Sequence, residues 1–251
     1  MKVKQAADLI KQSSNTIALT GAGISTPSGI PDFRSDDKGL WANVNPMDVA
    51  SLSAFRQNPQ KFFDWIRPLL CGIFNASPNP AHFALAKLEA AGYLSGIITQ
   101  NIDNLHRRAG SKIIHEVHGS INTLTCVSCY ITYDSRDFFK ACSELGLVPY
   151  CEKCGHILKP DVILYEEQLP YKIWQASEKA TQAADLMIVI GSSLVITPTA
   201  ALPVAALNNG AKLIMINNSP TYIDERAEIV INEDIGQILP LIAKEILGED
   251  G

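Results

Sequence analysis

Four of the six cysteines occur in two pairs that have the spacing of a metal site. Cys126 and Cys129 form one CxxC pair, and Cys151 and Cys154 form the other. Four thiolates in this pattern favour tetrahedral zinc, which stabilises small loops that have too little apolar core to fold without it. Because four sulfurs complete a tetrahedral shell, we expect a structural zinc ion with no open position for chemistry.

Two other interpretations of the cysteine-rich segment are weaker. Disulfides or unligated thiols are disfavoured because paired CxxC motifs are uncommon by chance and an intracellular protein stays reduced. Zinc ribbons often bind nucleic acid, but no basic stripe exists between residues 126 and 154, where acidic residues outnumber basic ones. Cys71 and Cys142 lack the pair spacing and are expected to be small buried hydrophobes, and His156 is an alternative ligand.

An apolar run at 16–20 ends in the glycine turn Gly-Ala-Gly at 21–23. Such a run is typical of a buried strand, and a glycine turn after it can bring backbone N–H groups close to a phosphate. Glycine after a strand is also ordinary turn chemistry, which stays open as the alternative. The dehydrogenase fingerprint would need a glycine where Thr26 stands and a second strand that residues 40–46 do not resemble. The pattern therefore favours a nucleotide site and disfavours an ordinary dehydrogenase.

His118 is the candidate general base among the five histidines. It ends the strand-like run 113–118 and precedes Gly119, which lets the chain turn and leaves the imidazole facing the ligand side of a sheet. His115 is expected on the opposite face of the run, because strand side chains alternate. A neutral imidazole at such an edge suits proton abstraction at physiological pH, although a satisfied surface or core histidine is the alternative that the residues leave open.

These candidate residues follow predicted strands in an α/β pattern. Apolar runs predict the strands, and helical periodicity predicts the segments between them. We therefore expect a Rossmann-like parallel sheet with helices on both faces, whose ligands bind beyond the carboxyl ends of the strands. The expected strands are 17–19, 97–98, 186–190, 213–216 and 229–231, and the expected helices are 3–10, 82–91, 173–184, 199–208 and 235–247.

Two segments interrupt this alternation and are expected to form a smaller domain. Residues 32–79 have loop and helix character without a clear strand, and residues 123–159 contain the CxxC pairs. The expected large, nucleotide-binding domain comprises 1–31, 80–122 and 160–251. The small domain would then consist of a helical module and a zinc-binding module.

The composition excludes several classes of protein. The 251 residues are 47% hydrophobic, which is enough for a sizeable core, and the formal net charge is −5. This charge favours neither nucleic acid nor an anionic membrane surface as a partner. Residues 1–15 lack a continuous apolar region and no later run is long enough to cross a membrane, so we expect a soluble, cytoplasmic protein. The sequence does not indicate an oligomeric state.

Several motifs, in this order and spacing, resemble those of the sirtuins, a family of NAD-dependent protein lysine deacylases. They are GAGIS at 21–25, GIPDFR at 29–34, TQNID at 99–103, the His-Gly pair at 118–119, the two CxxC pairs and GSSL at 191–194. The resemblance covers nearly the whole chain. It implies an acetylated protein or peptide as substrate and NAD as co-substrate, with nicotinamide, O-acyl-ADP-ribose and free lysine as products. A mono-ADP-ribosyltransferase that uses the same NAD site and a non-catalytic zinc and nucleotide binder are the alternatives.

The resemblance also implies roles for individual residues. His118 would draw a proton from the ribose hydroxyls, and Phe33 would shield the nicotinamide site from water. Asn101 and Asp103 would fix the ribose, an ordered water and the nicotinamide amide, and with His118 they form the implied catalytic set. The implied substrate-binding residues are Phe33, His118, Ile163, Tyr165 and Glu166. The implied NAD-binding residues are Gly21, Ala22, Gly23, Thr26, Asp32, Phe33, Arg34, Gln100, Asn101, Ile102, Asp103, Gly191, Ser192, Ser193, Asn217, Asn218, Asp234 and Ile235.

Two features of this chain bear on its substrate. Where the family commonly has Phe-Gly-Glu, residues 165–167 are Tyr-Glu-Glu, in the segment to which the family adds its peptide as a strand. Members that remove succinyl or malonyl groups carry a Tyr and an Arg three residues apart, and the aligned residues here are Phe63 and Ile66. Arg67 lies one residue further, about 100° around a helix. We therefore expect an apolar acyl channel, with removal of acetyl and longer neutral acyl groups and little activity on acidic ones.

Overall fold

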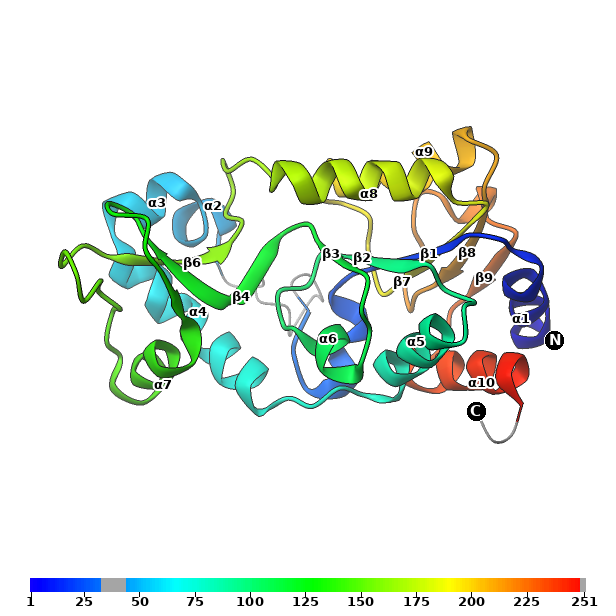
Figure 1. The fold of residues 1–251 in the computed structure, drawn as a ribbon, viewed down its shortest axis with the longest axis horizontal. Helices are drawn as coiled ribbons and strands as arrows, with labels where there is room; N and C mark the ends of the chain where they lie inside the picture. Colours follow the sequence, from blue (N-terminus) through cyan, green and yellow to red (C-terminus); the bar gives the residue numbers. More distant parts are fainter. Residues whose placement is uncertain (33–43, 249–251) are drawn as a thin grey trace.

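The structure is a computed structural model that describes residues 1–32 and 44–248. A six-stranded sheet has the order β3-β2-β1-β7-β8-β9, and each pair of neighbouring strands in it is parallel (Figure 1). This strand order is that of dinucleotide-binding folds, in which ligands bind where the order reverses. The Rossmann-like parallel sheet expected from the sequence is confirmed. Its strands are β1 (Thr16–Thr20), β2 (Gly96–Thr99), β3 (Ile114–Glu116), β7 (Leu186–Ile190), β8 (Lys212–Ile216) and β9 (Ile229–Ile231).

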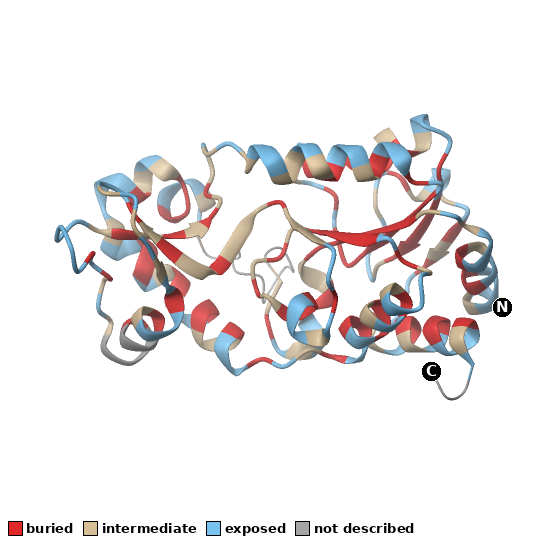
Figure 2. Cartoon of the chain, in the orientation of Figure 1, coloured by how far each residue is buried: buried red, intermediate tan, exposed pale blue. Residues whose placement is uncertain are grey.

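Helices cover both faces of the six-stranded sheet (Figure 1). They are α1 (Lys2–Gln12), α5 (Pro80–Ala90) and α10 (Ile235–Leu247) on one face, and α8 (Tyr171–Ala183) and α9 (Leu202–Asn208) on the other. Strand side chains alternate between the faces, so Ala18 packs with α1, α5 and α10, whereas Ile17 and Leu19 pack with α8 and α9. As a result β1 and β7 are buried along their whole length (Figure 2).

Short helical turns connect these elements. They are η1 (Ala22–Ile24), η2 (Thr26–Ser28), α6 (Leu105–Ala109), η3 (Thr199–Ala201) and η4 (Asp224–Arg226). The helix expected over 199–208 begins as the 3₁₀ turn η3, because Pro203 lacks the N–H that would bond to the Thr199 carbonyl in a regular α-helix. In the described residues no helix combines the length and the apolar character needed to cross a bilayer.

A three-stranded antiparallel sheet, in the order β5-β4-β6, lies toward the end of the molecule away from the two termini (Figure 1). Its strands β4 (Gly119–Cys126) and β6 (Leu158–Val162) run across the domain boundaries expected after residue 122 and before residue 160. The polar run at 159–161 conceals β6 from an analysis of apolar patterns. A separate apolar cluster joins this sheet to the nearby helices. The remaining elements here are β5 (Thr132–Asp134), α2 (Pro46–Val49), α3 (Leu52–Gln57), α4 (Pro59–Asn75) and α7 (Ser135–Leu145).

Two buried histidines pack against each other between α5 and α6. The rings of His82 and His106 have centroids 4.9 Å apart. His82 Nδ1 accepts the Asn79 N–H at 3.3 Å, and His106 Nε2 lies 2.9 Å from Thr20 Oγ1. Burial lowers the pKa of His82 to about 4 and that of His106 to about 3. Both rings are therefore neutral near neutral pH.

We expect the free energy of unfolding to fall as the pH is lowered from about 6.5 to about 4. Unfolded histidines take up protons in this range while folded His82 and His106 stay neutral, so stability that is present above the ordinary histidine pKa is lost as the pH falls. Urea unfolding at several pH values measures this slope. His82→Asn should reduce the slope, whereas replacement of the exposed His156 by Asn should leave it unchanged. If the free energy of unfolding had the same slope against pH in the wild type and in both variants, carboxylates and not these histidines would cause the loss of stability in acid.

Candidate functional site

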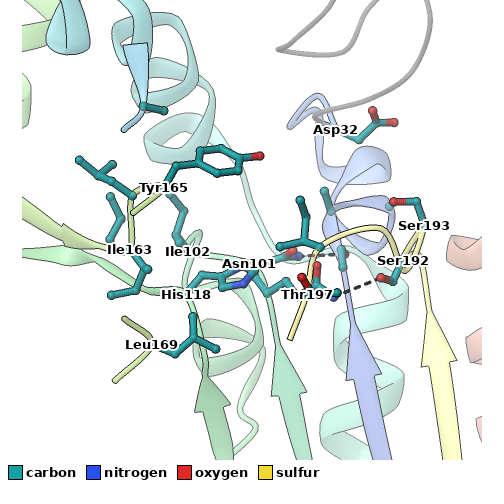
Figure 3. Close-up of a pocket in the computed structure, with 18 of the residues that line it drawn as sticks. Asp32, Asn101, Ile102, His118, Ile163, Tyr165, Leu169, Ser192, Ser193 and Thr197 are labelled. Atoms are coloured by element: carbon teal, nitrogen blue, oxygen red, sulfur yellow. Dashed lines mark hydrogen bonds between the residues drawn. The ribbon is translucent and has the colours of Figure 1, made fainter. Parts of the chain in front are cut away.

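A cavity of about 940 Å³ opens at the carboxyl ends of the parallel strands and reaches residues that follow β6. Figure 3 shows His118, Asn101, Ser192 and Tyr165 around it, contributed by separate segments of the chain. Asp103 and Asp234 do not line the cavity, and Phe33 and Arg34 lie outside the described residues. The expected site residues that do line it are Gly21, Ala22, Gly23, Thr26, Asp32, Gln100, Asn101, Ile102, His118, Ile163, Tyr165, Glu166, Gly191, Ser192, Ser193, Asn217, Asn218 and Ile235.

Two glycine turns meet backbone to backbone at the cavity. The Gly21 N–H donates to the Ile190 oxygen at 3.0 Å, and the Gly23 N–H donates to Gly191 at 2.9 Å. A Cβ on Gly21 would lie 2.7 Å from the Gly191 oxygen, so a side chain there would force the turns apart. The glycines thus allow β1 and β7 to approach, and both of their N–H groups are engaged within the chain. Among the described residues, the Ala22 N–H at the start of η1 has no acceptor and is the donor of this turn that is left for a ligand.

Gln100 and Ser192 connect the ends of β2 and β7 through a side-chain hydrogen bond. The Gln100 side-chain amide donates to Ser192 Oγ at 3.2 Å, and the Leu194 N–H donates to the same oxygen at 3.3 Å. Because this oxygen accepts both bonds, the Ser192 O–H can itself donate. Ser193 adds a second, exposed hydroxyl on the cavity wall. The pair of hydroxyls is suited to an anionic ligand such as a phosphate.

The far end of the cavity is formed by the segments after β8 and β9. Asn217 donates from Nδ2 to the Ser219 oxygen at 2.6 Å, so its own turn orients it. Asp234 accepts the Gln237 N–H at 3.2 Å and caps α10. Since this bond holds the Asp234 side chain against its own helix, Ile235 lines the cavity and Asp234 does not.

His118 lines the cavity with one ring nitrogen held by the protein. Nδ1 lies 3.2 Å from the Gln100 carbonyl oxygen, which can only accept, so Nδ1 carries the proton and Nε2 is the basic nitrogen of the neutral ring. Burial lowers the pKa of His118, although the Gln100 carbonyl opposes this shift. Gly119 has a φ of 77°, and a Cβ there would overlap the Asp161 oxygen. His115 does not line the cavity.

Ser25 is a buried hydroxyl that connects Asn101 to Asp103. Asn101 Nδ2 donates to Ser25 Oγ and to the Gly21 oxygen, both at 3.1 Å. Ser25 Oγ in turn donates to Asp103 Oδ2 at 2.6 Å, and the Leu105 N–H donates to Oδ1 at 2.9 Å. Burial raises the pKa of Asp103, and these hydrogen bonds oppose the shift. Asp103 thus lies behind the cavity wall. The site residues expected from the sequence do not include Ser25. The one feature of the sequence that points to Ser25 is its hydroxyl close to the glycine turn.

The four paired cysteines come together at the end of β4 and in the loop before β6. Their Sγ atoms all lie within 4.8 Å of one another, with 3.4 Å between Cys126 and Cys154 and 3.6 Å between Cys129 and Cys151. Tetrahedral zinc with bonds of about 2.3 Å needs sulfurs about 3.8 Å apart, so the set fits zinc. The Tyr133 hydroxyl lies 3.1 Å from the Cys151 sulfur.

The other candidate ligands of the sequence stay outside this cluster. His156 is exposed, and its Nδ1 lies 3.1 Å from the Cys154 carbonyl oxygen. Cys142 is buried, as expected, whereas Cys71 is only half-buried. The zinc site expected from the CxxC spacing is therefore supported by the four cysteines alone.

Comparisons by sequence and by structure agree. A family model described as the Sir2 family matches residues 21–198. The NAD-dependent protein deacylase 2 of Archaeoglobus fulgidus is 42% identical over 247 residues, which cover 98% of this chain and 96% of that protein. The NAD-dependent protein deacetylase of Sulfurisphaera tokodaii is 43% identical over 246 residues, with the same coverage of 98% and 96%. The chain belongs to the Sir2 family.

A solved Sir2 structure matches this sirtuin over nearly its whole length. That structure is of a Sir2 variant with a deacetylated p53 peptide and 3′-O-acetyl-ADP-ribose. It has a TM-score of 0.92 and 38% identity, and the match covers 98% of each chain. The motifs of the sequence resemble those of the sirtuins, and this match confirms that resemblance. It also confirms the expected Rossmann-like fold class.

Glu166 of this sirtuin has an unusual backbone conformation. Its φ is 74°, a conformation that glycine adopts without strain. The segment begins beside the candidate base, because the Ile163 N–H donates to the His118 oxygen at 2.9 Å. Ile163, Tyr165 and Glu166 all line the cavity.

An apolar face of α4 forms another wall of the sirtuin's cavity. Ile66 lines this wall, as expected, but the expectation that Phe63 lies beside it is wrong. The Phe63 ring is fully buried and packs edge-on against Phe62 and Phe55. At about 100° of rotation per residue, the side chains at positions 62, 65, 66 and 69 fall within one stripe of the helix, whereas residue 63 lies about 100° around the helix from residue 62. The α4 residues on the wall are Phe62, Trp65, Ile66 and Leu69.

None of the described residues that line the cavity is Lys or Arg. Arg67 of α4 donates to Asp64 Oδ1 at 2.6 Å and contacts the Gly146 oxygen at 3.5 Å, away from the wall. The cavity wall that α4 forms is therefore apolar, and Phe62, not Phe63, lies on it with Ile66.

Proposed function

We propose that this chain is an NAD-dependent protein lysine deacetylase that also removes longer neutral acyl groups. The products would be nicotinamide, O-acyl-ADP-ribose and free lysine. One observation carries the proposal: a neutral His118 ring with Nδ1 held by Gln100 lines a cavity that also touches both glycine turns and residues 163–166. The related proteins have names that describe NAD-dependent deacetylases and deacylases, which does not favour the mono-ADP-ribosyltransferase alternative.

The residues at the edge of the parallel sheet fit NAD. When bound, NAD supplies the ADP-ribose group that accepts the acyl group. The Ala22 N–H and the Ser192 and Ser193 hydroxyls would contact the pyrophosphate, because they are the donors that line this part of the cavity. Asn217 and Ile235 would contact the adenosine end. The further NAD contacts that we propose are Gly21, Gly23, Thr26, Asp32, Phe33, Arg34, Gln100, Ile102, Gly191 and Asn218, whereas Asp234 is left out because it does not line the cavity.

His118 would act as the general base. Its Nε2 takes a proton from a ribose hydroxyl, and the Gln100 carbonyl stabilises the imidazolium through the Nδ1–H. Asn101 would act beside it: both hydrogens of its Nδ2 are used by Ser25 and Gly21, so its Oδ1 is the atom that can accept from a hydroxyl or a water. Asp103 would position Asn101 through the Ser25 hydroxyl.

The proposed substrate is an acetylated protein or peptide that adds as a strand along residues 163–166. The apolar α4 wall would receive the acyl group. Zinc would hold the cysteine-containing loops together and take no part in the reaction, because four sulfurs leave no open position.

We propose two domains around this site. The large domain comprises 1–31, 80–122 and 160–251, and the small domain comprises 32–79 and 123–159. Support comes from the apolar clusters, since one contains the small sheet with α4 and two others flank the parallel sheet. β4 and β6 would link the two domains, because they cross the boundaries.

Incubation with NAD and an acetyl-lysine peptide tests the proposed function. We expect nicotinamide and deacetylated peptide in equal amounts, and neither product when NAD or the acetyl group is omitted. Nicotinamide release that leaves the peptide acetylated would contradict the proposal.

Acyl selectivity is a further prediction from the α4 wall. We expect kcat/KM to be similar for acetyl- and butyryl-lysine and at least about 100-fold lower for succinyl-lysine, because a buried carboxylate without a cation costs several kcal/mol. Three acyl forms of one peptide measure this order. Ile66→Arg should raise the succinyl-to-acetyl ratio, whereas Arg67→Leu, on the other side of α4, should leave it unchanged. A succinyl value equal to or above the acetyl value would refute the assignment of the wall.

A further inference from the structure

Glu166 is held in an unfavourable backbone conformation by contacts at the surface. Its φ of 74° lies in the left-handed region, where a residue with a Cβ is disfavoured. The residue is exposed, so burial in a core does not hold it there. Such a conformation persists only where surrounding interactions determine it. The contacts of the Glu166 side chain are therefore expected to hold this conformation.

The Glu166 carboxylate binds the first turn of α3 with both oxygens. Oε2 accepts the Ser53 N–H at 2.9 Å, and Oε1 accepts the Ser53 hydroxyl at 3.0 Å. The Ser53 N–H is one of the donors that a helix leaves unpaired at its N-terminus, where a negative charge is also favoured. The carboxylate is thus occupied by α3.

Backbone hydrogen bonds extend this attachment to the neighbouring residue. The Tyr165 N–H donates to the Ala50 oxygen at 2.9 Å, and the Leu52 N–H donates to the Tyr165 oxygen at 3.0 Å. Ser51 lies between these contacts and is completely buried. Residues 50–53 and 165–166 are therefore joined at three points, of which the Glu166–Ser53 contact is the last.

We propose that Glu166 is a positioning residue that fixes the peptide-binding segment 163–166 to α3 and thereby sets the affinity for the acyl-peptide. The inference rests on the proposed function. A peptide that adds as a strand binds more tightly to an ordered edge than to a disordered one. The reason is that a disordered edge must be ordered during binding, and this costs free energy.

Steady-state kinetics with an acetyl-peptide test this role. Glu166→Ala should raise the KM for the peptide about fivefold, the effect of about one net hydrogen bond, and should lower kcat by a smaller factor. Glu166→Gln should restore most of the affinity, because its amide can still accept from the Ser53 N–H and donate to the hydroxyl oxygen. Ser53→Ala should raise the same KM by a smaller factor, and adding it to Glu166→Ala should have no further effect. Glu178→Ala, an exposed substitution on α8, serves as the matched control.

Two measurements separate this role from direct contact with the substrate. Peptides with basic and acidic flanks should be affected equally by Glu166→Ala; an effect confined to basic flanks, together with a silent Ser53→Ala, would overturn the proposal in favour of an ion pair with the peptide. Hydrogen exchange at the Leu52 and Tyr165 amides should be faster in Glu166→Ala, and unchanged exchange would also overturn it. Hydrogen exchange is measured without turnover. If the wild-type chain did not deacetylate the peptide, the proposed function would be refuted, but the exchange test of Glu166 would still be valid.

Discussion

Replacement of His118 by alanine should lower NAD-dependent deacetylation at least about 100-fold, the usual loss for a general base. The wild-type ring lines the cavity, its pKa is lowered by burial, and Gln100 holds Nδ1 so that Nε2 is the basic atom. Alanine removes that atom and leaves Gly119 and both glycine turns in place. The effect should therefore appear in kcat at saturating NAD and peptide, while calorimetry shows that NAD still binds.

His115→Ala is the matched control for this experiment. His115 lies on β3, three residues before His118, and is half-buried, but it does not line the cavity. We expect its replacement to change kcat by no more than a few-fold. If His115→Ala were the damaging substitution and His118→Ala were neutral, the assignment of the base would be wrong.

Replacement of Cys151 by alanine should abolish zinc binding and unfold the three-stranded sheet. Cys151 is buried and contributes one of the four converging sulfurs. Zinc contributes about 10–16 kcal/mol to the folding of zinc-finger peptides, which is comparable to the entire stability of a typical domain. Bound zinc per chain, measured by atomic absorption, and the melting temperature should both fall. Activity should fall as well, because β4 follows His118 directly.

Cys71→Ala provides the control for the loss of a thiol alone. Cys71 lies on α4, outside the cluster, and its replacement should retain a full complement of zinc. A Cys151→Ala protein with full zinc content and an unchanged melting temperature would contradict the assignment of the ligands.

The central strands β1, β2 and β7 of the parallel sheet could be predicted from sequence because each is buried on both faces. β1 and β7 form continuous apolar runs, which leave little ambiguity. β6 could not be predicted in this way. It pairs with β4 and carries Lys159, Pro160 and Asp161, so its pattern is not that of a buried strand. The domain boundary placed at residue 160 consequently falls inside a strand.

The site was predictable where spacing or motif carries the chemistry. The CxxC pairs identify the zinc ligands, and the motifs place His118 and both glycine turns at one edge of the sheet. What the sequence does not reveal are contacts between residues that are far apart in the chain. Ser25 meets Asp103 and Glu166 meets Ser53 only after folding.

Tertiary packing also decided the details of the acyl wall. A helix pattern shows which residues of α4 are apolar, but Phe62, Phe63 and Ile66 are all apolar, and the packing of α4 determines which of them line the cavity. Phe63 packs into the core with Phe55, which no local pattern indicates.

The most direct test of the proposed function is the fate of the acetyl group. A peptide with isotope-labelled acetyl-lysine would be incubated with NAD and the chain, and all products analysed by mass spectrometry. We expect the label on ADP-ribose, in an amount equal to the free lysine peptide and to nicotinamide. Label released as free acetate without consumption of NAD, or ADP-ribose attached to a protein while the peptide keeps its label, would contradict the assignment of this chain as an NAD-dependent deacetylase.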